Sequence, residues 1–86
     1  MKPKVRKPTD RESREAEFWP IWEKEESQFP WKYDVKETCL ILEGEAVVKT
    51  PDESIEFAAG DYVVFPEGLK CTWDVKKKIR KYYKLG

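Results

Sequence analysis

The sequence predicts an all-β protein, a sandwich or barrel of short antiparallel strands preceded by one short helix. Its 86 residues are enough for one domain with a compact core. From residue 37 onward, short apolar stretches are separated by turn residues about every ten positions, a pattern typical of antiparallel β architectures. Residues 69–75 add strict alternation of apolar and polar side chains, which indicates a half-buried strand.

The single predicted domain covers residues 1–86, with a polar N-terminal segment (residues 1–17) and a barrel (residues 18–85). Thr9 and Glu12 have the spacing of a capping box. In that motif the threonine hydroxyl and the glutamate carboxylate each accept a hydrogen bond from a backbone N–H of the first turn. A short helix is therefore predicted over about residues 10–17.

Two aromatic stretches follow, at residues 18–22 and 29–33. Each contains a proline, which removes a backbone N–H and restricts the residue before it. We therefore expect short extended pieces at both places rather than helix.

The remaining strands are separated by turns rich in Gly, Pro and Asp. We expect turns at residues 43–44, 51–54, 60–61 and 66–68, and a turn or charged edge at 76–78. The predicted strands are residues 37–42, 46–50, 55–58, 62–65, 69–75 and 79–85.

Strand 37–42 is apolar on both faces, apart from Glu37 and Thr38 at its start, so it should lie centrally and be covered on both sides. Cover for its outer face is expected from the N-terminal aromatic segment or from a second subunit. The residues expected to provide it are Trp19, Ile21, Trp22 and Phe29. An ordinary core position is the simpler alternative for each of them in a chain this short.

The composition excludes several classes of function. The chain has no histidine, which excludes histidine metal sites, histidine general bases and nucleophiles activated by histidine. Its 17 basic and 17 acidic residues balance, which argues against general nucleic-acid or anionic-membrane binding. Two cysteines, no long apolar run and no secretory signal favour a cytoplasmic protein, with an organelle left open.

One motif near the C-terminus resembles the second motif of the cupin family. The residues Gly60-x5-Pro66-x-Gly68-x2-Cys71 are similar to G-x5-P-x-G-x2-H-x3-N. The resemblance places Cys71 at the position of the metal-binding histidine, and Val75 at the position of the asparagine.

A second stretch, Glu37-x6-Gly44, resembles the end of the first cupin motif, H-x-H-x3-E-x6-G. Counting back places Trp31 and Tyr33 at the two histidine positions. The resemblance therefore implies that the metal ligands of a typical cupin correspond here to Trp31, Tyr33, Glu37 and Cys71.

Three longer stretches, WPIWEKE, ETCLILEGE and GDYVVFPEGLKCTW, resemble one subgroup of the family. It comprises small single-domain RmlC-like cupins related to the (S)-ureidoglycine aminohydrolase cupin domain. The similarity extends from Trp19 to Leu85 and implies a cupin jelly-roll barrel that often forms a homodimer. The aminohydrolases use a divalent metal held by histidines, which this chain lacks, so their activity does not carry over.

If the barrel forms, Glu37 and Cys71 point into its mouth and are the candidate catalytic residues. The expected ligand-binding residues are these two together with Trp31, Tyr33 and Trp73. Burial would raise the pKa of Glu37 and suit it to acid–base chemistry near neutral pH. The Tyr33 hydroxyl could donate a hydrogen bond to Glu37 or to a ligand, and the tryptophans could stack on a planar or sugar-like molecule.

Each candidate has a plainer alternative. Glu37 could be a relic of a metal site, hydrogen-bonded to Tyr33 or to a backbone N–H. Cys71 could simply line the pocket, because nothing in the sequence explains a lowered thiol pKa. Cys39 is most simply a core residue, and a Cys39–Cys71 disulfide stays open if the Cα atoms lie within about 7 Å. One carboxylate, one thiol and one phenol make a rare metal site, so we predict no metal and no cofactor.

Residues 76–84 carry six basic residues and two tyrosines. A surface for single-stranded nucleic acid would combine these types. Lysines on an edge strand, which prevent edge-to-edge pairing, are the favoured interpretation.

The leading hypothesis is a metal-free small cupin of unassigned activity. It would bind a small polar metabolite in the barrel. An extended form of the hypothesis is that it also transforms this metabolite. One alternative is a non-catalytic interaction or structural module whose interior is filled by its own side chains. A second alternative is a divalent-metal-dependent, aminohydrolase-like enzyme. We expect no nucleic-acid or membrane partner.

Overall fold

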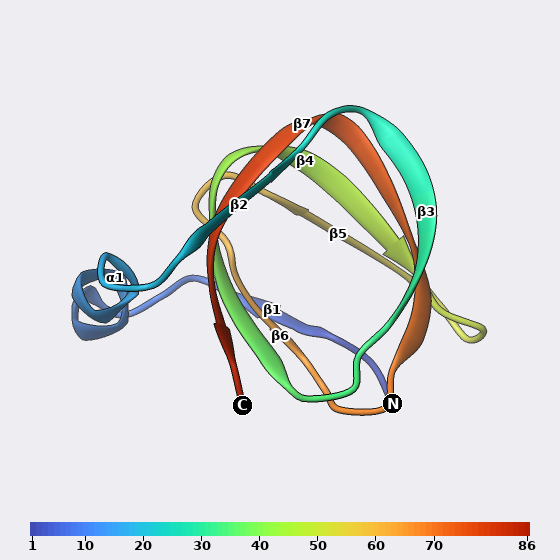
Figure 1. Cartoon of the computed structure of the whole chain (residues 1–86), viewed down its shortest axis with the longest axis horizontal. Helices are drawn as coiled ribbons and strands as arrows, with labels where there is room; N and C mark the ends of the chain where they lie inside the picture. The colour runs from blue at the N-terminus through green and yellow to red at the C-terminus, as the bar shows by residue number, and fades with distance from the viewer.

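The computed structural model describes all residues, 1–86, and consists of strands and one short helix (Figure 1). The strands form one seven-stranded antiparallel sheet that curls around a core, which confirms the predicted all-β fold class. No helix is long and apolar enough to cross a membrane. The elements in chain order are β1 (Lys4–Arg6), α1 (Asp10–Ala16), β2 (Ile21–Lys24), β3 (Ser27–Lys32), β4 (Glu37–Lys49), β5 (Ser54–Ala58), β6 (Tyr62–Phe65) and β7 (Lys70–Leu85).

Two long strands, β4 and β7, form the centre of the sheet. They pair with each other from Glu37 opposite Leu85 to Lys49 opposite Thr72. β4 also pairs with β5 and β6, and β7 also pairs with β2 and β3. β7 therefore has neighbours on both sides, and its basic residues do not lie on an edge strand as expected.

The predicted turn at residues 43–44 is wrong, because the chain continues through it as β4. The register shifts at this point, and Gly44 has a φ of 91°. A Cβ atom on Gly44 would lie 2.1 Å from the carbonyl oxygen of Lys78 in β7, so only glycine fits there. The irregularity also changes which residues face inward, from odd positions such as Cys39 to even positions such as Val48.

The predicted break at residues 76–78 is also wrong. β7 runs without interruption for 16 residues, since Lys77 pairs with Glu45 of β4. The alternation predicted for residues 69–75 is confirmed, because Cys71, Trp73 and Val75 are all buried.

The inward face of the sheet holds the main core, which consists of Tyr33, Cys39, Ile41, Ala46, Val48, Phe57, Val63, Phe65, Leu69, Cys71, Trp73, Val75 and Ile79. Trp22 and Phe29 pack against this core. They therefore occupy ordinary core positions, which was the simpler alternative to covering the outer face of β4. Ala16 of α1 and Trp19 pack against Leu40 on the other face of β4, so of the four residues expected to cover this face only Trp19 does. Ile21 is 43% exposed.

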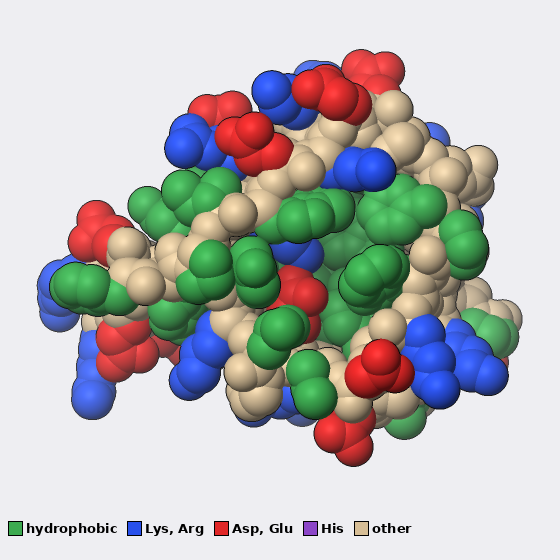
Figure 2. Space-filling model, in the orientation of Figure 1, with side chains coloured by type: hydrophobic (Ala, Val, Ile, Leu, Met, Phe, Trp, Pro, Cys, Tyr) green, Lys and Arg blue, Asp and Glu red, His purple; other side chains and the backbone are tan.

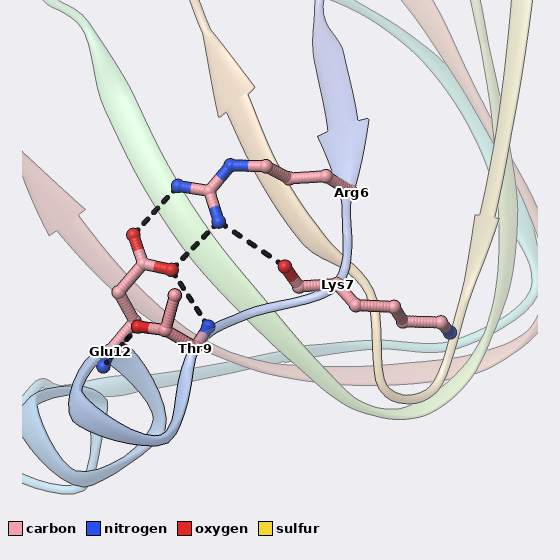
Figure 3. Close-up of polar contacts among 4 residues, drawn as sticks. All are labelled: Arg6, Lys7, Thr9 and Glu12. Atoms are coloured by element: carbon pink, nitrogen blue, oxygen red, sulfur yellow. Dashed lines mark hydrogen bonds and ion pairs between the residues drawn. The ribbon is translucent and has the colours of Figure 1, made fainter.

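The N-terminal segment contains the predicted helix and one strand that was not predicted (Figure 3). The capping box is confirmed: Glu12 N–H donates to Thr9 Oγ1 at 3.1 Å, and Thr9 N–H donates to Glu12 Oε1 at 2.9 Å. Arg6, the last residue of β1, donates two hydrogen bonds to the Glu12 carboxylate at 2.7 and 2.6 Å. These bonds from Arg6, together with that from Thr9, lower the pKa of Glu12 to about 2. Since β1 pairs with β6, the ion pair attaches the helix to the barrel.

Candidate functional site

A cavity of about 610 Å³ opens on the concave side of the sheet, between β2, β3 and β7. Figure 2 shows a hollow on this face that is bordered by hydrophobic side chains, with basic and acidic groups visible inside it. The lining residues are Trp22, Glu23, Lys24, Phe29, Pro30, Trp31, Tyr33, Glu37, Trp73, Lys81, Tyr83 and Leu85. Four of the five residues predicted to bind a ligand, all except Cys71, therefore line one cavity.

A buried ion pair lies in the wall of this cavity. Lys81 Nζ donates to Glu37 Oε2 at 2.5 Å, and the two side chains are only 6% and 10% exposed. Glu37 is the first residue of β4, and Lys81 lies on β7. Both positions face inward with the buried residues of their strands, Cys39 and Ile79. The partner of Glu37 is thus neither Tyr33 nor a backbone N–H, the two partners expected from the sequence.

Aromatic rings surround the Lys81 ammonium. Its nitrogen lies 4.8 Å from the ring centre of Trp22, 4.7 Å from that of Trp73 and 5.7 Å from that of Phe65. The electron-rich ring faces attract a cation and replace part of the hydration that burial removes. Of the three N–H donors of the ammonium, only the one directed at Glu37 has a hydrogen-bond acceptor within the protein.

Tyr33 lies deep in the same wall. Its hydroxyl accepts a hydrogen bond from Trp73 Nε1 at 3.0 Å, and its ring stacks on Phe65 with the ring centres 4.8 Å apart. Burial, and then the nearby Glu37 carboxylate, raises the pKa of Tyr33 well above its usual value. The hydroxyl therefore keeps its proton, for which the protein itself supplies no acceptor.

Cys71 lies opposite Trp31 in the pairing of β3 with β7, but it is buried in the core and does not line the cavity. Burial raises the pKa of Cys71 to about 11 and that of Cys39 to about 12. Both thiols are free, so the disulfide left open by the sequence does not form. A thiol with a raised pKa is protonated at neutral pH and is a weak nucleophile.

The residues at the cupin metal positions do not fit a metal ion. The chain contains no group of three or more His, Cys, Asp or Glu side chains that could hold one. The Glu37 carboxylate is already paired with an ammonium, and the Tyr33 oxygen already accepts a hydrogen bond from Trp73. A fixed cation of the protein thus lies against the carboxylate that would hold the metal in a typical cupin.

Sequence reasoning missed Lys81, which was assigned to a charged edge. The signal that could have found it is the alternation in the last strand. Ile79, Lys81, Tyr83 and Leu85 occupy every second position, so Lys81 shares the face of three apolar residues.

Solved structures of other proteins resemble this fold. The chain is 48% identical to a DUF861 family protein from Thermotoga maritima, over 99% of this chain and 100% of that one, with a TM-score of 0.94. It is 26% identical to a putative ethanolamine utilization protein Q (EutQ) from Salmonella typhimurium, over 76% of this chain and 53% of that one, with a TM-score of 0.70. The EutQ protein of Clostridium difficile is 20% identical over 76% of this chain and 52% of that one, with a TM-score of 0.70, and shows the shared fold alone.

The chain thus spans about half the length of the two EutQ proteins and the whole of the Thermotoga maritima protein. No curated protein matches it. The EutQ-like cupin domain matches residues 11–83, which is most of the chain. The chain therefore belongs to the EutQ-like cupin domain family, and this establishes the small cupin expected from its two motifs.

Proposed function

We propose that the protein binds a small polar metabolite in the cavity, without a metal ion. The observation that carries this proposal is the buried Glu37–Lys81 pair in the wall of an aromatic cavity. A buried ion pair seldom stabilises a fold more than apolar residues of the same size would. Its position at a cavity therefore supports a role in recognition, in which a few polar groups orient a ligand between apolar walls.

The size of the cavity favours a binding protein over an interaction module. Small-molecule sites occupy roughly 300–1,000 Å³, and this cavity measures about 610 Å³. An interaction module of the kind considered above would fill its interior with its own side chains.

The charges of the wall restrict the ligand. Glu37 and Lys81 neutralise each other, and the two other charged lining residues, Glu23 and Lys24, also carry opposite charges. The wall therefore has no net charge to offset a net charge on a ligand, which would lose hydration on binding. A neutral or zwitterionic ligand avoids this cost. The Tyr33 proton and the two unused N–H donors of Lys81 call for acceptor oxygens. Trp31, which is 52% exposed, offers a ring on which a planar group could stack.

A thermal-shift screen tests the proposal, because a ligand that binds only the folded state raises the melting temperature by RT ln(1 + [L]/Kd). Ureides are the neutral probes and should give the larger shifts. Sugar acids and amines, which carry a net charge at neutral pH, are the comparison, and the amines are included because two relatives are named for ethanolamine utilization. Trp31→Ala should abolish the shift of a confirmed ligand. Phe18→Ala, which removes an exposed ring outside the cavity, should preserve it. Equal shifts in the two variants would place the ligand elsewhere.

Two of the candidate residues call for variants of their own. Glu37→Gln should weaken binding, because the amide oxygen can accept the Lys81 hydrogen bond but cannot neutralise its charge. Cys71→Ala should leave the affinity unchanged, because Cys71 is packed in the core and does not line the cavity; a loss of binding would contradict this.

A relationship to the (S)-ureidoglycine aminohydrolase cupin domain remains a proposal about ancestry. The formation of a homodimer is a separate proposal. Light scattering of the purified chain tests the dimer. Elemental analysis of protein purified without an affinity tag tests the metal-dependent alternative. One equivalent of a divalent metal per chain would overturn the metal-free site.

A further inference from the structure

We propose that Lys81 forms a reversible Schiff base with a small aldehyde or ketone bound in the cavity, and that Glu37 transfers the protons. The inference rests on the proposed function, because it uses the same cavity and narrows its ligands to carbonyl compounds.

The first argument is the position of the amine. Lys81 lines the cavity, yet only 5% of the residue is exposed, and it is the one buried lysine of the chain. A surface lysine is surrounded by water that hydrolyses an imine, whereas a lysine buried against the Trp22 and Trp73 rings is shielded from it. Lys24 lines the same cavity but is exposed, so it has the same access to a ligand without the shielding.

The second argument is the hydrogen-bond pattern of the ammonium. Its three N–H groups include one that bonds to Glu37 and two that have no acceptor. A protonated Schiff base keeps one N–H and loses the other two. The reaction therefore needs no hydrogen bond of the folded protein to break.

The third argument is charge. Lys–NH3⁺ and a carbonyl compound give Lys–NH⁺=CR2 and one water, so the positive charge is retained. Glu37 keeps a cationic partner, and the cation keeps the faces of Trp22 and Trp73. A reaction that neutralised Lys81 would leave the carboxylate buried without a partner, which is costly.

The steps balance with Glu37 as the only proton carrier. The carboxylate takes one proton from the ammonium, and the free amine attacks the carbonyl carbon to form a C–N bond. Glu37 gives its proton to the new alkoxide and takes a second proton from the nitrogen, which leaves the neutral carbinolamine and a protonated Glu37. Glu37 then returns its proton to the carbinolamine hydroxyl, the C–O bond breaks, water leaves, and the iminium faces the regenerated carboxylate. The contact of 2.5 Å between Lys81 Nζ and Glu37 Oε2 is within reach for this exchange.

Reductive trapping tests the inference. The native chain is incubated with propanal or benzaldehyde and sodium cyanoborohydride, and the labelling rate of each lysine is measured by peptide mass spectrometry. We expect Lys81 to react at least about tenfold faster than Lys24, an advantage that should disappear in denaturant. Glu37→Gln should slow labelling of Lys81 by about tenfold or more and leave Lys24 unchanged. Lys81→Arg should abolish the adduct at position 81.

Labelling of Lys81 at or below the rate of Lys24 in the native wild-type chain would overturn the inference, whether or not the Glu37→Gln variant folds. The two proposals fail differently. If ligands without a carbonyl group raise the melting temperature and no adduct forms, the Schiff base is refuted and the binding function stands. If no compound of either kind binds, both are refuted.

Discussion

Removal of the Lys81 ammonium should destabilise the protein severely. In Lys81→Met the side chain keeps its length and apolar character, but Glu37 loses its partner while remaining about nine-tenths buried. Breaking a buried pair in this way costs about 3–5 kcal/mol, because one charge is left without compensation. A domain of 86 residues has a total stability of about 4–13 kcal/mol. The substitution should therefore remove a large part of it and lower the melting temperature by roughly 12 °C or more.

A double-mutant cycle separates the pair from other effects of the substitution. Glu37→Gln in the Lys81→Met background removes the stranded charge, so the double variant should be more stable than Lys81→Met alone. The coupling energy should be about 2 kcal/mol or more. Lys77 and Glu45 form an exposed ion pair across the same two strands, with side chains 68% and 49% exposed. The matching cycle there should give about 0.2–1 kcal/mol.

Urea unfolding followed by tryptophan fluorescence measures each variant. If Lys81→Met lowers the free energy of unfolding by less than about 1 kcal/mol, the Glu37 carboxylate does not depend on the Lys81 ammonium to compensate its buried charge. Equal couplings in the two cycles would likewise refute the reasoning.

Three further outcomes follow from the geometry. Neither Cys39 nor Cys71 should react with a disulfide reagent at pH 8 in the native state, because burial raises their pKa values to about 12 and about 11. Both should react after unfolding, and rapid labelling of the native protein would contradict their burial. The carboxyl of Glu12 should titrate near pH 2 by NMR, against an ordinary 4.5. Because its folded pKa is lowered, its contribution to stability should be complete above about pH 4.5 and lost as the pH falls toward 2; a normal titration would exclude the ion pair. Gly44→Ala should lower the free energy of unfolding by roughly 1–3 kcal/mol more than Gly60→Ala. Both glycines have φ above 90°, but the atom nearest to the added Cβ lies at 2.1 Å at Gly44 and at 3.6 Å at Gly60. Equal losses of stability in urea unfolding would show that the strands do not approach so closely at Gly44.

Local patterns in the sequence are sufficient for most of the elements. The capping box at Thr9 and Glu12 predicts the helix, because both of its hydrogen bonds form within one turn. Strand 62–65 is predicted with its observed bounds, because turn residues delimit it on both sides. Alternation also assigns the faces correctly, since a side chain on a strand points to one side whatever the strand pairs with.

Motif spacing singled out Trp31, Tyr33 and Glu37, and these line one cavity together with Trp73, which was expected as a stacking ring. Ligand binding by these residues stays a prediction. The same reasoning included Cys71, which is packed into the core instead. A motif gives the position along a strand, whereas access to the cavity depends on the side chains that neighbouring strands place in front of it.

The length of the two central strands depends on contacts between them. Gly44 looks like a turn residue in isolation and becomes a bulge because β7 lies against it. Lys81 looks like part of a solvated basic stretch, and its burial depends on a carboxylate 44 residues earlier in the chain. Alternation along a strand is a property of neighbouring residues, so it can be read without coordinates. The charge partner of a buried side chain is set by which strands pair and in which register, here β4 with β7. That pairing joins residues far apart in the sequence, so only the tertiary structure decided it.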